Sequence, residues 1–156
     1  MPTSTSVPTT INAVLARAIG EEEAAHVYYL EVEQRATNET VKRLFLQLAR
    51  EELQHKTFLL ECRNQPEQLA KLPATIDYGI AATVPEPALT PDLKPADAIA
   101  LAMKKEQQAV ELYRALAAAT KDPGLRAALE GLARMELEHK HRLEEAFVGV
   151  GYPEVF

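Results

Sequence analysis

The sequence lacks several features that would indicate particular classes of protein. It has a single cysteine, Cys62, among 156 residues, which excludes a disulfide framework and any metal or iron–sulfur site built from several thiolates of this chain. No apolar run approaches the roughly 20 residues that a membrane-spanning helix needs. Basic residues are outnumbered, and the net charge of −6 argues against nucleic acid, whose binding proteins usually present a basic face. We therefore expect neither nucleic acid nor a membrane as a partner.

The composition that remains is that of one soluble globular domain. Hydrophobic residues make up 47% and charged residues 26% of the chain, which is long enough to bury a sizeable core. Residues 1–10 are rich in Ser, Thr and Pro, with no basic segment and no apolar segment. We interpret them as a flexible N-terminal tail and not as a secretory signal. The cytoplasm is the expected location.

One short pattern occurs twice and organises the chain. Each copy is Glu-x-x-His, and residues three apart share a helix face, so the carboxylate and the imidazole point the same way. A further Glu lies 30 residues before each copy, and a Tyr follows that Glu. The first set is Glu22, Tyr29, Glu52 and His55, and the second, 84 residues later at every position, is Glu106, Tyr113, Glu136 and His139. We interpret this as an internal duplication in which each half is one helical hairpin.

Hydrophobic periodicity predicts four long helices, over about residues 11–36, 41–62, 95–120 and 123–148, with a polar turn over residues 37–40 between the first two. Asn38 and Asp122 are suitable N-caps, and Pro95 and Pro123 are suitable first-turn residues. The helices predict a four-helix bundle over residues 11–148, with one hairpin over 11–62 and a second over 95–148. Residues 149–156 would form a C-terminal tail.

The segment between the hairpins, residues 63–94, is rich in proline, so a continuous helix is not expected there. Two antiparallel hairpins need one long connection, because the chain must return along the length of the bundle. We therefore interpret residues 63–94 as a crossover. Its apolar residues Ile76, Tyr78, Ile80 and Val84 would let it pack across the bundle surface.

The ionisable residues of the repeat fall on the apolar faces of the helices. They are Glu22, Glu52, His55, Glu106, Glu136 and His139. Glu51, next to Glu52, falls off that face. A buried carboxylate without a partner is costly, and these faces offer no Lys or Arg at the same level. Two divalent cations would balance four ionised glutamates, whereas without metal the carboxyls should take up protons and their pKa values should rise.

The ligand pattern resembles that of a known group of proteins. Ferritin-like di-metal carboxylate bundles take one Glu from each of two helices and a Glu-x-x-His from each of the other two, and roughly residues 11–147 match this pattern. The stretch PADAIALAMKKE, which ends at Glu106, together with Glu136-Leu137-Glu138-His139, resembles the rubrerythrin family. The resemblance implies an all-α, ferritin-like four-helix bundle of two antiparallel hairpins. It also implies two iron ions as cofactors, with manganese and zinc as other candidates.

The resemblance also implies a role for each residue of the repeat. Glu52 and Glu136 would bridge or chelate both metals, Glu22 and Glu106 would be terminal ligands, and His55 and His139 would bind one metal each. Two interpretations stay open for Tyr29 and Tyr113. Each could orient a carboxylate ligand through a hydrogen bond, or each could be a core aromatic residue whose hydroxyl reaches any acceptor.

The function implied by the resemblance is that of an oxidoreductase that reduces peroxide or dioxygen, as a peroxidase or a ferroxidase. An iron-binding or storage protein without turnover of a separate substrate is the alternative, and a purely structural bundle is a third hypothesis. Rubrerythrins carry a further carboxylate one turn before the third-helix ligand, where this chain has Met103, with Ile19 at the corresponding place in the first half. The chain also lacks the paired Cys-x-x-Cys motifs of a rubredoxin module, so an external electron-donor protein or Fe(II) itself would supply electrons. By analogy we expect a homodimer.

Overall fold

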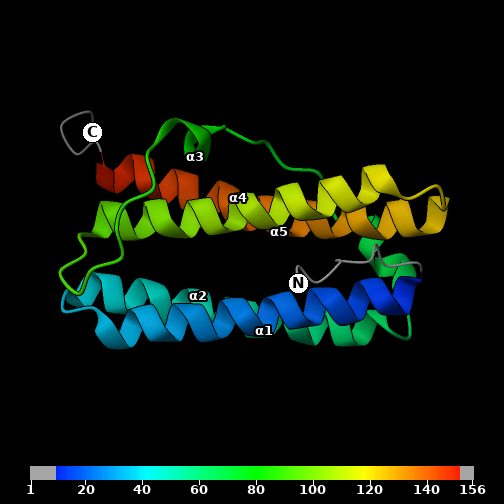
Figure 1. Ribbon diagram of the computed structural model, residues 1–156, viewed down its shortest axis with the longest axis horizontal. Coiled ribbons are helices and arrows are strands. Elements are labelled where there is room, and N and C mark those ends of the chain that lie inside the picture. The colour runs from blue at the N-terminus through cyan, green and yellow to red at the C-terminus, as the bar shows by residue number, and fades with distance from the viewer. Residues whose placement is uncertain (1–9, 152–156) are drawn as a thin grey trace, which may run out of the picture.

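Four long helices form two antiparallel hairpins that pack side by side in the computed structural model, which describes residues 10–151 and the side chains as far as Gly149 (Figure 1). The first hairpin consists of α1 (Ile11–Arg35) and α2 (Glu39–Cys62). The second consists of α4 (Pro95–Ala119) and α5 (Pro123–Gly151). Residues 10–151 contain no strand and no helix that is both long and apolar enough to cross a membrane. The predicted all-α, ferritin-like bundle of two hairpins is confirmed.

The helix ends follow the local signals in the sequence. Asn38 Oδ1 accepts from the backbone N–H groups two and three residues on, at 2.9 and 3.2 Å. Asp122 Oδ1 does the same at 2.8 and 3.1 Å, so both predicted N-caps are confirmed. The last helix continues through Gly149 to Gly151, because glycine weakens a helix without removing its hydrogen bonds. The rest of the predicted C-terminal tail, residues 152–156, and residues 1–9 of the N-terminal tail lie outside the described residues.

The crossover, which Figure 1 shows running along the second hairpin, contains two short helices, η1 (Pro66–Lys71) and α3 (Ile80–Thr83). The fully buried Leu69 of η1 packs against α5. Gly131 of α5 makes this approach possible, because a Cβ at that position would overlap the carbonyl group of Leu69. The start of the crossover is therefore fixed by a backbone contact that only glycine allows.

A buried acid and a buried base of α5 hold the middle of the crossover. Glu144 Oε2 accepts from the backbone N–H groups of Ile80 and Ala81, at 2.5 and 3.0 Å, and so caps α3. Lys140 Nζ donates to Asp77 Oδ1 at 2.6 Å. These contacts attach the crossover to α5 through polar groups that the apolar pattern does not reveal.

The apolar residues of the crossover pack less completely than the sequence suggests. Ile80 and Val84 contact the apolar core, as expected. Ile76 is 65% exposed, so for this residue the expectation is wrong, and Tyr78, at 51% exposed, packs only in part. The polar contacts described above position this segment instead, and the ring of Tyr78 lies against that of His141, with centroids 4.8 Å apart.

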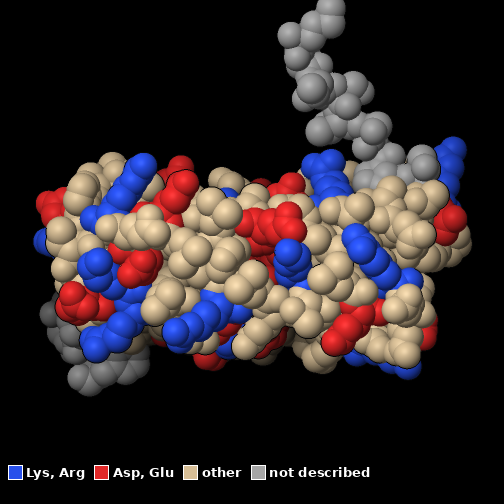
Figure 2. Space-filling model, turned by 90° about the horizontal axis from the view of Figure 1, so that it is seen from below, with Lys and Arg blue, Asp and Glu red and all other residues tan. Residues whose placement is uncertain are grey.

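The core consists of two apolar clusters separated by a polar layer. One cluster includes Tyr29 and Phe45, and the other includes Leu59 and Leu129. On each long helix the residues between the two clusters include a buried glutamate. On the outer face that Figure 2 shows, basic and acidic residues are intermixed and neither sign forms a broad patch. The four glutamates of the polar layer, by contrast, are charged residues buried inside the bundle.

Candidate metal centre

Each long helix brings one glutamate into the middle of the bundle. Glu22 comes from α1, Glu52 from α2, Glu106 from α4 and Glu136 from α5, and each is at most 3% exposed. The equal spacing in the two halves of the chain brings the acids of both hairpins to one level. The structure thus buries all four predicted acids together, in the layer between the apolar clusters.

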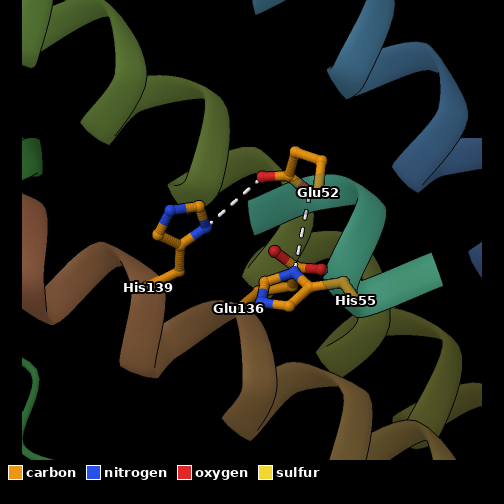
Figure 3. Close-up of side chains that lie close together, drawn as sticks. All are labelled: Glu52, His55, Glu136 and His139. Atoms are coloured by element: carbon orange, nitrogen blue, oxygen red, sulfur yellow. Dashed lines mark ion pairs between the residues drawn. The ribbon is translucent and has the colours of Figure 1, made fainter. Parts of the chain in front are cut away.

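The two histidines lie among these acids. His55 and His139 are one turn beyond Glu52 and Glu136, and potential ligand atoms of these four residues all lie within 4.8 Å of one another. Figure 3 shows ion pairs from Glu52 to both imidazoles. Glu52 Oε1 is 3.3 Å from His139 Nδ1, and Glu52 Oε2 is 3.6 Å from His55 Nδ1. In both histidines Nδ1 is therefore the nitrogen that faces the acids.

The remaining two acids divide the cluster into halves. Glu22 Oε2 lies 3.3 Å from His55 Nδ1, and Glu106 Oε1 lies 3.3 Å from His139 Nδ1. Among the four glutamates of the repeat, each histidine thus has one acid of its own, and Glu52 is shared between them. Such a division suits two metal ions with a bridging carboxylate. The ligand roles themselves stay predictions.

Several polar atoms of the cluster are buried without a hydrogen bond. Among the described side chains they include Glu52 Oε1 and both ring nitrogens of His139, although each lies 3.3 Å or less from a group of potentially opposite charge. Buried polar atoms are rarely left unsatisfied in native proteins. Oxygen and nitrogen atoms that converge in this way can be satisfied by a cation, so the donor set fits a metal site.

Lysine and arginine do not neutralise these acids. In the part of the chain that the structure describes, the ion pairs of Glu22, Glu52 and Glu106 are made with histidine alone. An uncompensated buried carboxylate is strongly unfavourable. The cluster must therefore bind cations or hold protons.

The pKa values show how the metal-free cluster distributes its protons. Burial, with the charge of Glu52 adding to it, raises the pKa of Glu22 to about 10. Burial and the charges of Glu106 and Glu22 raise the pKa of Glu136 well above its ordinary value. Burial also disfavours the ionised form of Glu52, but the contacts with His139 and His55 outweigh it and lower its pKa. Glu22 and Glu136 therefore hold protons, as expected of such a cluster without metal, whereas for Glu52 the expected rise in pKa is wrong because the two imidazoles favour its ionised form.

The two tyrosines of the repeat behave differently. Tyr29 Oη donates to Glu106 Oε1 at 3.0 Å, from one hairpin to the other. Tyr113 Oη is buried and has no hydrogen-bond partner among the described residues. The first tyrosine thus contacts a carboxylate of the cluster, whereas the second does not.

A cavity of about 130 Å³ between α1 and α4 reaches the acids. Ala25 and Ala109, which occupy equivalent places in the two halves of the repeat, line it. Their small side chains leave space between the helices. Tyr113 also lines the cavity, with its hydroxyl buried. The exposed Glu21 and Gln108 line the same cavity, so a small molecule can reach the acids from this side.

One contact of the cluster was not predicted. Glu51 lies off the apolar face of its own helix, yet its Oε2 is 2.6 Å from His139 Nε2. Glu51 Oε1 accepts from Arg142 at 3.1 Å. The periodicity of α2 could not reveal this pair, because it depends on how α2 packs against α5.

A four-helix bundle with four glutamates and two histidines at one level of its core defines the class of ferritin-like carboxylate proteins. The sequence matches the rubrerythrin family over residues 13–147, and the chain belongs to that family. The resemblance that the motifs suggested is confirmed. A hypothetical protein from Pyrococcus furiosus has a similar solved structure, with 25% identity over 94% of both chains and a TM-score of 0.50. No curated protein matches the sequence.

Proposed function

We propose that this protein binds two metal ions, iron by its family, and reduces hydrogen peroxide or dioxygen. The proposed ligands are Glu22, Glu52, His55, Glu106, Glu136 and His139. The observation that carries the proposal is the buried acidic cluster, in which four glutamates share one level and three of them, Glu22, Glu52 and Glu106, form ion pairs with imidazoles. Carboxylate and imidazole ligands without thiolate suit iron and manganese, and zinc fits the same set but brings no redox chemistry.

The reaction needs electrons, protons and access for the oxidant. Two ferrous ions, when bound, supply the two electrons that with two protons convert one hydrogen peroxide into two waters, or one dioxygen into hydrogen peroxide. The cavity between α1 and α4 gives a small oxidant a route to the acids. Tyr29 holds Glu106 Oε1, which leaves the carboxylate with a fixed orientation. The apolar clusters on both sides exclude water along the bundle axis.

A stoichiometric oxidation tests this proposal. The protein is loaded anaerobically with two equivalents of Fe(II), mixed with hydrogen peroxide or dioxygen, and followed by absorbance and by oxidant consumption. We expect one peroxide to be consumed for two irons, faster than by Fe(II) in buffer. Glu52→Gln should abolish this acceleration, whereas Glu130→Gln, at an exposed position of α5, should retain it. Oxidation no faster than in buffer would contradict the proposed activity.

Iron storage is the alternative function, and one residue favours it. Met103, where rubrerythrins carry a further carboxylate, is fully buried in an apolar cluster. Met103 therefore adds no further carboxylate to the six proposed ligands. Iron content separates the two functions, because a catalytic centre takes two irons per chain and a store takes many.

A purely structural bundle would show no rise in thermal stability with Mn(II), whereas metal binding to the folded state alone must raise that stability.

Two further proposals concern partners. The chain has one cysteine and so no thiolate cluster of its own that could relay electrons. Repeated turnover therefore needs an external electron-donor protein, and reduction of the oxidised protein by a small redox protein tests this. We also propose a homodimer in the cytoplasm, and sedimentation equilibrium at several protein concentrations tests the dimer.

A further inference from the structure

The contact between Glu51 and His139 joins the two hairpins beside the proposed metal site. Glu51 is half-buried on α2, and its Oε2 lies 2.6 Å from His139 Nε2 on α5. The other ring nitrogen, Nδ1, faces Glu52 and Glu106 at 3.3 Å. One nitrogen of this imidazole thus points into the acidic cluster, while the other meets an acid outside it.

Glu51 is itself held in place. Its Oε1 accepts from Arg142 Nη1 at 3.1 Å and from Gln47 Nε2 at 3.3 Å. One carboxylate oxygen is therefore anchored to two side chains, and the other is directed at the imidazole. A carboxylate fixed in this way can restrict the orientation of the ring beside it.

The second half of the repeat has no equivalent of this acid. The residue 84 positions after Glu51 is Met135, whose thioether is at best a weak, uncharged acceptor. Among the described residues, the ion pairs of His55 are made through Nδ1 and involve Glu22 and Glu52. The two imidazoles therefore repeat in sequence, but of the two only His139 forms an ion pair through Nε2 in the described part of the chain.

We propose that Glu51 is a positioning residue for His139, and that it makes the two metal positions unequal. This inference depends on the proposed metal binding. A histidine that binds metal through one nitrogen usually donates its other N–H to an acceptor such as a carboxylate, which fixes the tautomer and strengthens the ligand. In the structure the Nε2–Glu51 contact is an ion pair and not an aligned hydrogen bond.

A zinc titration of the metal-free protein tests the inequality. For the wild-type chain we expect two zinc ions with unequal affinities. In Glu51→Gln one of the two affinities should fall by about 10- to 100-fold, while the other stays unchanged. Glu138→Gln is the matched control, because Glu138 pairs with Arg142 at 3.2 Å and, within residues 10–151, forms no ion pair with His139. This control should leave both affinities unchanged.

Nitrogen-15 NMR of the zinc-loaded protein tests the orientation directly. In the wild type, His139 should bind zinc through Nδ1, and its Nε2–H should exchange with water more slowly than that of His55. The exchange of His139 Nε2–H should become faster in Glu51→Gln. A general loosening of the packing in the variant would speed the exchange of other buried protons too, and not that of His139 Nε2–H alone. The comparison of His139 with His55 in the wild type can be made even if Glu51→Gln fails to fold.

The possible outcomes distinguish a failure of this inference from a failure of the proposed metal binding. A wild-type protein that binds no zinc would overturn both. Two bound zinc ions with affinities that Glu51→Gln leaves unchanged would overturn the role of Glu51 alone. Coordination of His139 through Nε2, or equal exchange of the two Nε2–H protons in the wild type, would also overturn it.

Discussion

The two tyrosines of the repeat provide a matched test of the structure around the acids. Tyr29→Phe removes a buried hydroxyl that donates to Glu106 Oε1 at 3.0 Å. Tyr113→Phe removes a buried hydroxyl that has no hydrogen-bond partner among the described residues. Both changes keep the ring and its apolar contacts, so the difference between them isolates the hydrogen bond.

The expected magnitudes follow from this difference. A hydrogen bond to a charged group contributes about 1.5–3 kcal/mol, so Tyr29→Phe should lower the free energy of unfolding by about 2 kcal/mol. For a domain of this size that corresponds to a fall in Tm of about 4–8 °C. A buried polar group without a partner costs about 1–3 kcal/mol, so Tyr113→Phe should leave stability unchanged or raise it.

Urea denaturation of the metal-free proteins, followed by circular dichroism, measures both variants under the same conditions. Zinc titration adds a second measurement, because the loss of a hydrogen bond to a metal ligand typically weakens metal binding by about 10-fold or more. We expect that effect for Tyr29→Phe alone. Equal losses of stability for the two variants would refute the reasoning, because they would mean that the hydroxyl of Tyr29 contributes no more than that of Tyr113.

Three further predictions concern two helix glycines, an acid of the crossover and the acidic cluster. Alanine stabilises a helix interior relative to glycine by up to about 1 kcal/mol, and Gly20→Ala should show this gain in urea denaturation because a Cβ there meets no atom within 4 Å. Gly131→Ala should be about 1–3 kcal/mol less stable than Gly20→Ala, which is the usual cost of overpacking. The reason is that its Cβ would lie 2.7 Å from the carbonyl carbon of Leu69. Equal gains in stability for the two variants would contradict the position of η1. Burial acts to raise the pKa of Asp77, but the Lys140 ammonium outweighs it and lowers that pKa. The stability that Asp77 contributes should therefore be complete above about pH 4 and lost as the pH falls further, so that denaturation curves of wild type and Asp77→Asn converge in acid. Metal binding should release protons from the acidic cluster and should tighten as the pH rises, because two carboxyls of the cluster hold protons near neutral pH. Calorimetry in buffers of different ionisation enthalpy measures how many protons are released.

Much of the fold could be predicted because its determinants are local or repeated. Apolar periodicity indicates the four long helices, and the side-chain acceptors Asn38 and Asp122 indicate where α2 and α5 begin. The repeat added long-range information, since two halves with the same spacing must place their acids at matching heights. That is why all four acids could be assigned to one level before any coordinates were known.

The parts that could not be predicted depend on contacts between segments. The crossover is positioned by Glu144, Lys140 and Gly131 of α5, and none of these residues has a local pattern that indicates this role. Glu51 was placed outside the site because its position on α2 lies off the apolar face. It meets His139 only because α2 packs against α5 at that level. Such contacts depend on the packing of the two hairpins, which a helix pattern does not specify.

The duplication of the ligands and the divergence around them have different physical causes. A cation in the core requires carboxylates and imidazoles in the right number, so the two halves must supply the same donors. The groups that contact those donors face no such requirement, and here they differ. Tyr29 donates to Glu106, whereas Tyr113 has no acceptor in the described part of the chain, and Glu51 stands where the second half has Met135. Both differences strengthen the contacts of Glu106 and His139, which are themselves neighbours. Within residues 10–151, Glu106 and His139 therefore have contacts, with Tyr29 and Glu51, whose counterparts are missing at Glu22 and His55.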